Sequence, residues 1–399
     1  MRISDIKYFG LRDFQYFILG LSIFLFVYPS FTWDYVSLVT PIAFLLLMLA
    51  LILEFLKSQS RQFISSLAPF LLFFLYNLYT SIVGISVDTS LFATPVLVTL
   101  IFFVFSKETI FHTYFVFVRI FGYILALSLL FYLLKLFRLY SPELISQTSP
   151  DGREYYSYLF NTMSAITTRN ALYLSSGFYR FHGFMGEPGW IGTISGLIVF
   201  SLKFQFSQFK ILYIYLFAAL LSMSLGAYIP LFVGFVYFYF GKRLLYAVIP
   251  LTMFFIFNRE ILDRFIFDRL YVDDGNIAGD NRTSAVFDHE WSKLLGTSEV
   301  IFGKGKGQHT VFGEGVSSWK TLVYNGGIIG FFLYLLIFMS IFFMLVKTGH
   351  KKFALIFFLV FLMTIYHRPR IQYVYFLIIL YGGLLYNEVK FKYLKNIKK

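Results

Sequence analysis

The sequence predicts an all-helical integral membrane protein that crosses the bilayer many times. Of its 399 residues, 58% are hydrophobic and only 14% are charged, whereas soluble domains average about 45–50% apolar and about 25% charged residues. Apolar runs long enough to cross a bilayer recur along nearly the whole chain, and they are continuous rather than alternating, which favours helices over a β-barrel. Residues 1–399 are therefore predicted to form a single membrane domain.

The apolar runs predict about twelve transmembrane helices. Their expected bounds are 13–31, 35–56, 63–84, 90–105, 111–137, 187–202, 211–226, 228–240, 244–257, 319–346, 353–366 and 371–387. The pair 211–226 and 228–240 has an alternative interpretation as a broken or re-entrant hairpin around Gly226 and Pro230. No small-residue cleavage site follows the first span, so this span is expected to act as an uncleaved signal anchor.

The distribution of lysine and arginine predicts the orientation. The short connections and the terminal tails on one side are rich in these cations, whereas the connections near 32–35 and 85–90 carry none. The positive-inside rule then places both termini in the cytoplasm and two long loops, 138–186 and 258–318, on the outer side. The net charge of +13 is explained by this asymmetry, so no nucleic-acid partner is expected. The absence of cysteine excludes disulfides and thiolate nucleophiles.

A dense group of polar residues stands at the entrance to the sixth predicted span. It reads Arg180-Phe181-His182-Gly183-Phe184-Met185-Gly186-Glu187-Pro188-Gly189-Trp190. Charged side chains at the mouth of a membrane helix are costly to desolvate, which favours a functional site. The alternative is that Glu187 and Pro188 simply begin a helix, since both residue types are favoured there.

Further arginines and glycines are predicted to lie on the same outer side. Loop two contains Arg282 and the run Phe302-Gly303-Lys304-Gly305-Lys306-Gly307, and a glycine-rich turn, 325–330, follows. The short outer turn at 367–370 holds Arg368 and Arg370 where the positive-inside rule disfavours them. They are either interfacial side chains that reach the headgroups or an anion site. Arginine pairs bidentately with phosphate, so a lipid-linked diphosphate is a suitable ligand.

Several other kinds of site are excluded by spacing. The glycines at 303–307 lack the lysine and hydroxyl residue of a phosphate-binding P-loop, and His289-Glu290 lacks the second histidine of a zinc protease. Residues 273–276 do not continue into a calcium loop. Neither a metal nor another cofactor is therefore predicted.

The pattern Arg180-x-x-Gly183-x-x-x-Glu187-Pro188-x-x-x-Gly192 resembles the signature of O-antigen polymerases of the Wzy type, within the O-antigen ligase/polymerase superfamily. The run from Arg282 through Gly303 and Gly305 to the turn at 327–330 resembles the second outer loop of that superfamily and the span after it. The resemblance covers the organisation of the whole chain, but its specific motifs lie only in about 180–192 and 282–330.

This resemblance implies a metal-independent glycosyltransferase of the GT-C-like class in the bacterial inner membrane. It would transfer a growing glycan from undecaprenyl diphosphate to a new undecaprenyl-diphosphate-linked repeat unit, with a chain-length regulator as a possible partner. Arg180 and Arg282 would be the leading diphosphate contacts, with Arg368 and Arg370 as further candidates, and Gly183, Pro188, Gly303 and Gly305 would shape the motifs. The candidate general bases are Glu187, His182 and His309. The alternatives are a hydrogen-bonded interfacial residue for His182 and an exposed loop residue for His309.

Two other functions remain open. A lipid-linked oligosaccharide flippase or other transporter would concentrate polar residues at the bilayer midplane, whereas here they concentrate in the outer loops. An O-antigen ligase would carry a histidine before the span after loop two, where this chain reads Gly315-Val316-Ser317-Ser318-Trp319. The sequence leaves open the sugars, the linkage, the oligomeric state, and whether the product is O-antigen, capsule or exopolysaccharide.

Overall fold

We describe the protein from a computed structural model. The residues described are 10–57, 67–84, 91–139, 145–148, 154–157, 164–166, 180–240, 272–273, 276–277, 283–312, 316, 318–346 and 351–397.

The chain is built mainly from helices, and every predicted span overlaps one except 244–257, which lies outside the described residues. The first half contains α1 (Leu11–Leu25), η2 (Ser30–Tyr35), α2 (Val36–Lys57), α3 (Leu67–Val83), α5 (Thr94–Phe102) and α6 (Lys107–Leu136). The second half contains α7 (Pro188–Ser201), α8 (Leu212–Leu221), α9 (Leu225–Phe235), η6 (Val236–Phe240), α13 (Ala285–Leu295), α14 (Glu299–Phe302), η9 (Gln308–Phe312), α15 (Lys320–Leu345), α16 (Lys351–Met363), η10 (Thr364–Tyr366) and α17 (Val374–Ile397).

The helices have the composition expected of a membrane protein. Three of them are long and apolar enough to cross a bilayer, over Ser30–Lys57, Lys107–Leu134 and Lys320–Leu345. Shorter apolar helices include α3, α7, α8 and the apolar part of α17. The break between α8 and α9 falls at residues 222–224. It therefore precedes Gly226 and Pro230, which both lie inside α9.

Short strands that the sequence did not predict lie in both predicted outer loops. Strands β1 (Ile145–Thr148), β2 (Glu154–Ser157) and β3 (Ser164–Ile166) form an antiparallel sheet in loop one. Strands β4 (Val272–Asp273) and β5 (Asn276–Ile277) pair in loop two. The prediction of an all-helical fold is therefore confirmed for the apolar spans that the structure describes but not for these loops.

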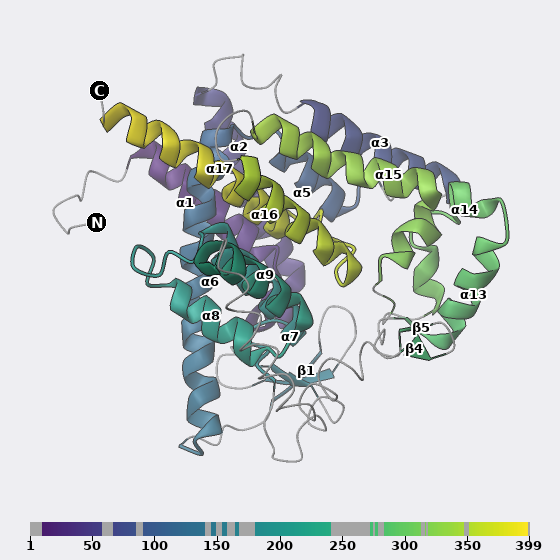
Figure 1. The fold of residues 1–399 in the computed structure, drawn as a ribbon, viewed down its shortest axis with the longest axis horizontal. Coiled ribbons are helices and arrows are strands. Elements are labelled where there is room, and N and C mark those ends of the chain that lie inside the picture. Colours follow the sequence, from purple (N-terminus) through teal and green to yellow (C-terminus); the bar gives the residue numbers. More distant parts are fainter. Residues whose placement is uncertain are drawn as a thin grey trace.

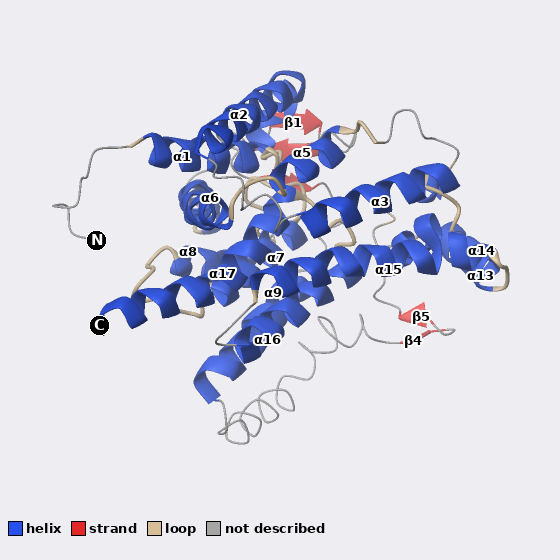
Figure 2. Cartoon of the chain, turned by 90° about the horizontal axis from the view of Figure 1, so that it is seen from above, coloured by secondary structure: helices blue, strands red, loops and turns tan. Residues whose placement is uncertain are grey.

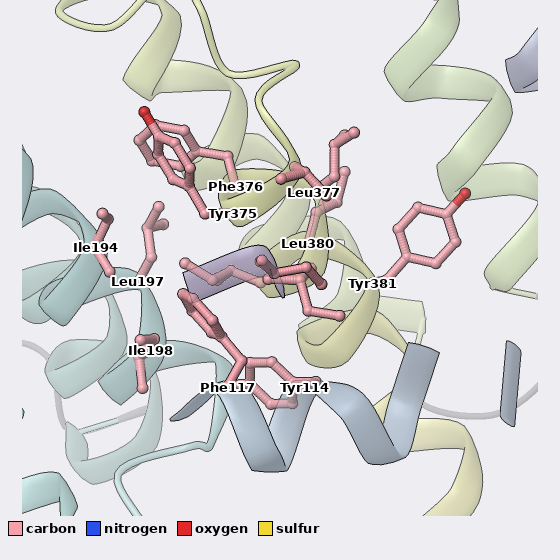
Figure 3. Close-up of a cluster of buried hydrophobic side chains, with 14 of the residues drawn as sticks. Tyr114, Phe117, Ile194, Leu197, Ile198, Tyr375, Phe376, Leu377, Leu380 and Tyr381 are labelled. Carbon is pink, nitrogen blue, oxygen red and sulfur yellow. The ribbon is translucent and has the colours of Figure 1, made fainter. Parts of the chain in front are cut away.

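The centre of the core lies where α6, α7 and α17 meet. Figure 3 shows Tyr114 and Phe117 of α6, Ile194 of α7, and Phe376 and Leu380 of α17 gathered in one buried cluster. Each of these side chains is at most 1% exposed.

Small residues let α7 pack closely against its neighbours. A Cβ atom at Gly192 would lie 2.2 Å from the Ser222 hydroxyl, and one at Gly196 would lie 2.8 Å from the Ala227 carbonyl oxygen. Close packing of helix backbones through small residues is characteristic of membrane helices. It explains why the motif at 180–192 ends on glycine.

The other helices extend away from this core. Helices α3 and α15 lie side by side, and α13 and α14 lie at the end of this pair that is far from the end of α17 (Figures 1 and 2). The start of α1 and the end of α17 lie at the same end of the molecule in both views.

Candidate functional site

A cavity of about 360 Å³ lies among α3, α5, α15 and the segments that lead into α7 and α17. Its charged lining residues are Glu187, Lys306, Arg368 and Arg370, and His309 also lines it. Asn77, Thr80 and Asn325 add polar groups, and Phe73, Tyr76, Val96, Trp190, Leu322 and Tyr373 are among its apolar and aromatic ones. The three cations outnumber the single carboxylate, so the cavity is suited to an anionic ligand.

Arg368 is the most deeply buried of these cations. Its side chain is 2% exposed, and its Nη2 atom lies 2.9 Å from Glu187 Oε2. Its guanidinium carbon lies 4.5 Å from the centre of the Trp190 ring, within cation–π range. Although the two charges pair, Nη2 is not oriented to donate a hydrogen bond to Glu187. Neither Nη2 nor Nε has a hydrogen-bond partner in the described part of the chain. A buried guanidinium with unused donors is costly unless a ligand accepts them.

The start of α7 places Glu187 in this cavity. Pro188 is the first residue of the helix and Glu187 is its N-cap, as the alternative interpretation of this motif predicted. The Glu187 carbonyl accepts a hydrogen bond from the amide of Trp190 at 3.1 Å. Because Glu187 and Trp190 share the first turn, both can contact Arg368. The motif therefore begins a helix and supplies a cavity residue at the same time.

The glycine run of loop two packs against a break in α15. Gly327 has φ 63° and ψ −173°, which interrupts the helix. The amides of Lys304 and Gly305 donate to the carbonyls of Tyr324 and Asn325, both at 2.8 Å. Gly303 has φ 83°, and a Cβ atom there would lie 2.4 Å from the amide nitrogen of Gly327. Glycine is required because the two backbones touch at a positive φ.

This packing places Lys306 in the cavity at the end of α3. Its amide donates at 3.0 Å to the carbonyl of Thr80 in the last turn of that helix, which also accepts from the Gly84 amide at 3.3 Å. Its ammonium group donates to Asn77 Oδ1 at 3.2 Å. Burial lowers the pKa of Lys306 below its usual value.

His309 is buried beside Lys306, so its interpretation as an exposed loop residue is wrong. Its side chain is 8% exposed. The amide group of Asn325 contacts its Nδ1 atom. Burial, and then the positive charge of Arg370, lowers the pKa of His309 below its usual value, so the ring is neutral at pH 7.

Two other predicted residues lie outside the cavity lining. Arg180 donates from Nε to the Ser222 carbonyl and from Nη2 to the Met223 carbonyl, both at 3.0 Å. It therefore binds carbonyls just beyond the end of α8, where a helix leaves its last carbonyls without helical partners. His182 is 2% exposed. Burial, and then the charge of Arg180, lowers the pKa of His182 to about 3.

The remaining predicted residues fall in three places. Gly183 has φ 56° and contacts Ile191 closely, so it shapes the turn before α7. Gly305 packs against Gly84 at the end of α3. Arg282 lies outside the described residues. In the part of the chain that the structure describes, no three histidine or acidic residues are grouped to hold a metal ion.

Sequence reasoning did not nominate Lys306, Asn325, Asn77 or Trp190. The two asparagines are polar residues inside apolar spans, a signal that was available in the sequence. Lys306 stands in a glycine run whose spacing excludes a phosphate-binding P-loop, and no local pattern distinguishes it from Lys304. Trp190 gave no signal of its own, because aromatic residues are abundant in this chain.

No protein-family model, curated protein or solved structure matches this chain.

Proposed function

We propose that the protein is an integral-membrane glycosyltransferase that polymerises lipid-linked oligosaccharide repeat units. In this proposal the growing glycan moves from undecaprenyl diphosphate to a sugar hydroxyl of an incoming undecaprenyl-diphosphate-linked unit. The reaction takes place at the outer face of the bacterial cytoplasmic membrane, with both termini in the cytoplasm. The observation that carries the proposal is the cavity that joins Lys306, Arg368 and Arg370 to Glu187 and His309.

The chemistry of this transfer needs two things that the cavity offers. The acceptor hydroxyl oxygen attacks the anomeric carbon of the donor, while the bond from that carbon to the diphosphate oxygen breaks. The leaving diphosphate keeps the electron pair, and nearby cations stabilise its charge. The hydroxyl proton must pass to a base within about 3 Å. The cavity provides Lys306, Arg368 and Arg370 for the first need, and Glu187 or His309 for the second.

The geometry favours these three cations over Arg180 as diphosphate contacts, because Arg180 binds backbone carbonyls at the end of α8. Arg368 has unused donors at the cavity wall. The side chain of Glu187 is 30% exposed and lines the cavity, so it is accessible to an acceptor sugar. His182 is fully enclosed and away from the cavity lining, which favours Glu187 and His309 as the candidate bases.

The arrangement of the helices also supports the proposed orientation. The start of α1 and the end of α17 lie at one end of the molecule, whereas α13 and α14 of loop two lie at the other (Figures 1 and 2). This is compatible with both termini on one side of a membrane and loop two on the opposite side.

The test is a polysaccharide gel from the native host with the gene intact, deleted, or replaced by Lys306→Gln. Lys304→Gln is the matched control, because Lys304 lies two residues away and forms an exposed ion pair with Glu299. We expect the deletion to leave single repeat units and no ladder, Lys306→Gln to shorten or remove the ladder, and Lys304→Gln to keep it.

Other outcomes would redirect the proposal. If the deletion removes every repeat unit from the final acceptor, a ligase or flippase becomes the better assignment. Accumulation of long lipid-linked polymer would then identify a ligase. If deletion leaves all surface polysaccharides unchanged, the proposed function is wrong.

A further inference from the structure

The tautomer of His309 is determined by hydrogen bonds to one amide group. The backbone amide of His309 donates to Asn325 Oδ1 at 3.3 Å. That bond orients the Asn325 side chain, because only its oxygen accepts. The Nδ2 atom of Asn325 then lies 2.8 Å from His309 Nδ1, while Oδ1 is farther from it, at 3.2 Å.

An amide nitrogen only donates, so His309 Nδ1 must accept this bond. In a neutral imidazole the proton then resides on Nε2. The lowered pKa of His309 is consistent with a neutral ring.

The Nε2–H group is available to a ligand. His309 lines the cavity, and no hydrogen bond from Nε2 to any described residue is present. His309 keeps 8% of its surface exposed, so part of the residue is open to the cavity that it lines. The other charged groups that face this cavity are Glu187 from α7, Lys306 from the glycine run, and Arg368 and Arg370 from the turn before α17.

We infer that Asn325 is a positioning residue that holds His309 as a neutral hydrogen-bond donor, with Nε2–H directed to an oxygen atom of the bound substrate. His309 therefore does not accept the proton in the transfer step, and Glu187 is left as the cavity group that can. The break of α15 at Gly327 contributes to this arrangement. The glycine run packs against the break, and His309 then lies next to Asn325. The identity of the bound oxygen rests on the proposed function, but the state of the ring does not.

The state of the ring can be measured directly. Histidine labelled with nitrogen-15 is incorporated into the full chain in nanodiscs, and the His309 ring signals are identified by their loss in His309→Gln. We expect a neutral ring with the proton on Nε2 at pH 7 in the unmodified protein. In Asn325→Asp the new carboxylate accepts from Nδ1–H, so we expect the proton to move to Nδ1 or the ring to become charged. Asn77→Asp is the control at the neighbouring asparagine and leaves the His309 tautomer unchanged. A ring that carries its proton on Nδ1, or a charged ring, in the unmodified protein overturns the inference.

Polymer formation by the same variants tests the role of the donor. The side-chain amide nitrogen of glutamine can replace Nε2–H but cannot act as a base. We therefore expect His309→Gln to keep activity within about tenfold of the unmodified protein and His309→Ala to lose about 100-fold. We also expect Asn325→Asp to add a pH dependence of activity that comes from titration of the His309 ring. Equal loss in His309→Gln and His309→Ala contradicts a donor role.

The two experiments separate the two claims. A ring with its proton on Nε2 together with unchanged surface polysaccharide in the deletion strain would disprove the proposed function and leave the role of Asn325 in setting the tautomer intact. Loss of polymer together with a proton on Nδ1 would disprove the role of Asn325 alone.

Discussion

Glu54 and Arg368 are both charged side chains buried among apolar helices, but their surroundings differ. Glu54 of α2 accepts hydrogen bonds from Gln15 of α1 at 2.8 Å, from the Ser106 amide at 3.0 Å and from Thr109 of α6 at 2.7 Å. Both of its carboxylate oxygens are therefore occupied. Arg368 has one ion-pair contact with Glu187, and its Nε and Nη2 atoms make no hydrogen bond within the described residues.

The difference separates two uses of buried charge. A fully bonded charge fixes how helices pack, because moving any partner leaves a buried polar group unpaired. A charge with unused donors at a cavity wall is available to a ligand. The hydrogen bonds of Glu54 therefore hold α1, α2 and α6 together, whereas the cavity that Arg368 lines is the candidate substrate site.

Arg368→Gln is expected to reduce polymer formation at least about 100-fold, the usual cost of removing a group that stabilises developing negative charge. It also removes the contacts with Glu187 and Trp190. The measurement is polymer length and amount on a gel, normalised to the amount of protein in the membrane. Arg12→Gln is the matched control, because its contact with Glu108 is long, at 3.9 Å, and exposed. Equal activity in the two variants would contradict a role for Arg368 at the site.

Glu54→Ala is expected to lower stability by about 3 kcal/mol, since hydrogen bonds to charged groups contribute about 1.5–3 kcal/mol each and the donors become unpaired. Activity per folded molecule should persist. Denaturation of the purified protein in detergent measures the first effect, and polymer formed per folded molecule measures the second. If stability is unchanged but activity disappears, then Glu54 belongs to the functional machinery and the comparison fails.

His182 makes stability depend on pH. Because the pKa of His182 is lowered to about 3 in the folded protein, the unfolded chain binds a proton below about pH 6.5 that the folded chain does not. Stability therefore falls as the pH decreases through this window, and the loss from pH 7 to 5 is about 2 kcal/mol. His182→Leu should remove that part of the loss, whereas His289→Leu, at an exposed histidine, should not. An identical pH dependence in all three proteins would contradict the enclosed position of His182.

Arg180→Gln is expected to lower stability by about 1–2 kcal/mol through loss of its bonds to the carbonyls of Ser222 and Met223. Polymer formation per folded molecule should stay near that of the unmodified protein. Polymer assays and unfolding midpoints of the same preparation check both statements. A large loss of activity with normal stability would instead favour the diphosphate contact that the family resemblance predicts for Arg180.

The helices could be predicted from sequence because each apolar span forms its backbone hydrogen bonds within its own helix, whatever that helix packs against. The position of Glu187 could be predicted for the same reason, since Pro188 begins a helix locally. The pairing of Glu187 with Arg368 could not be predicted, because the two residues are far apart in sequence and meet only after α7 and α17 pack. Similarly, His309 is buried by the break in α15 at Gly327, and no local pattern specifies where the glycine run docks. The strands in the two loops are short, with the longest four residues, and they carry no clear alternation.

We propose that the cavity around Arg368 performs the transfer. The most direct measurement uses purified protein in nanodiscs and the lipid-linked repeat unit that accumulates in the deletion strain. We predict that the unmodified protein and Arg12→Gln convert this lipid to a ladder of longer products and release undecaprenyl diphosphate. We predict that Arg368→Gln, which should fold and bind to the nanodisc, forms neither product at a comparable rate. A ladder of normal rate and length from Arg368→Gln, or no ladder from the unmodified protein with its own lipid, would contradict the account.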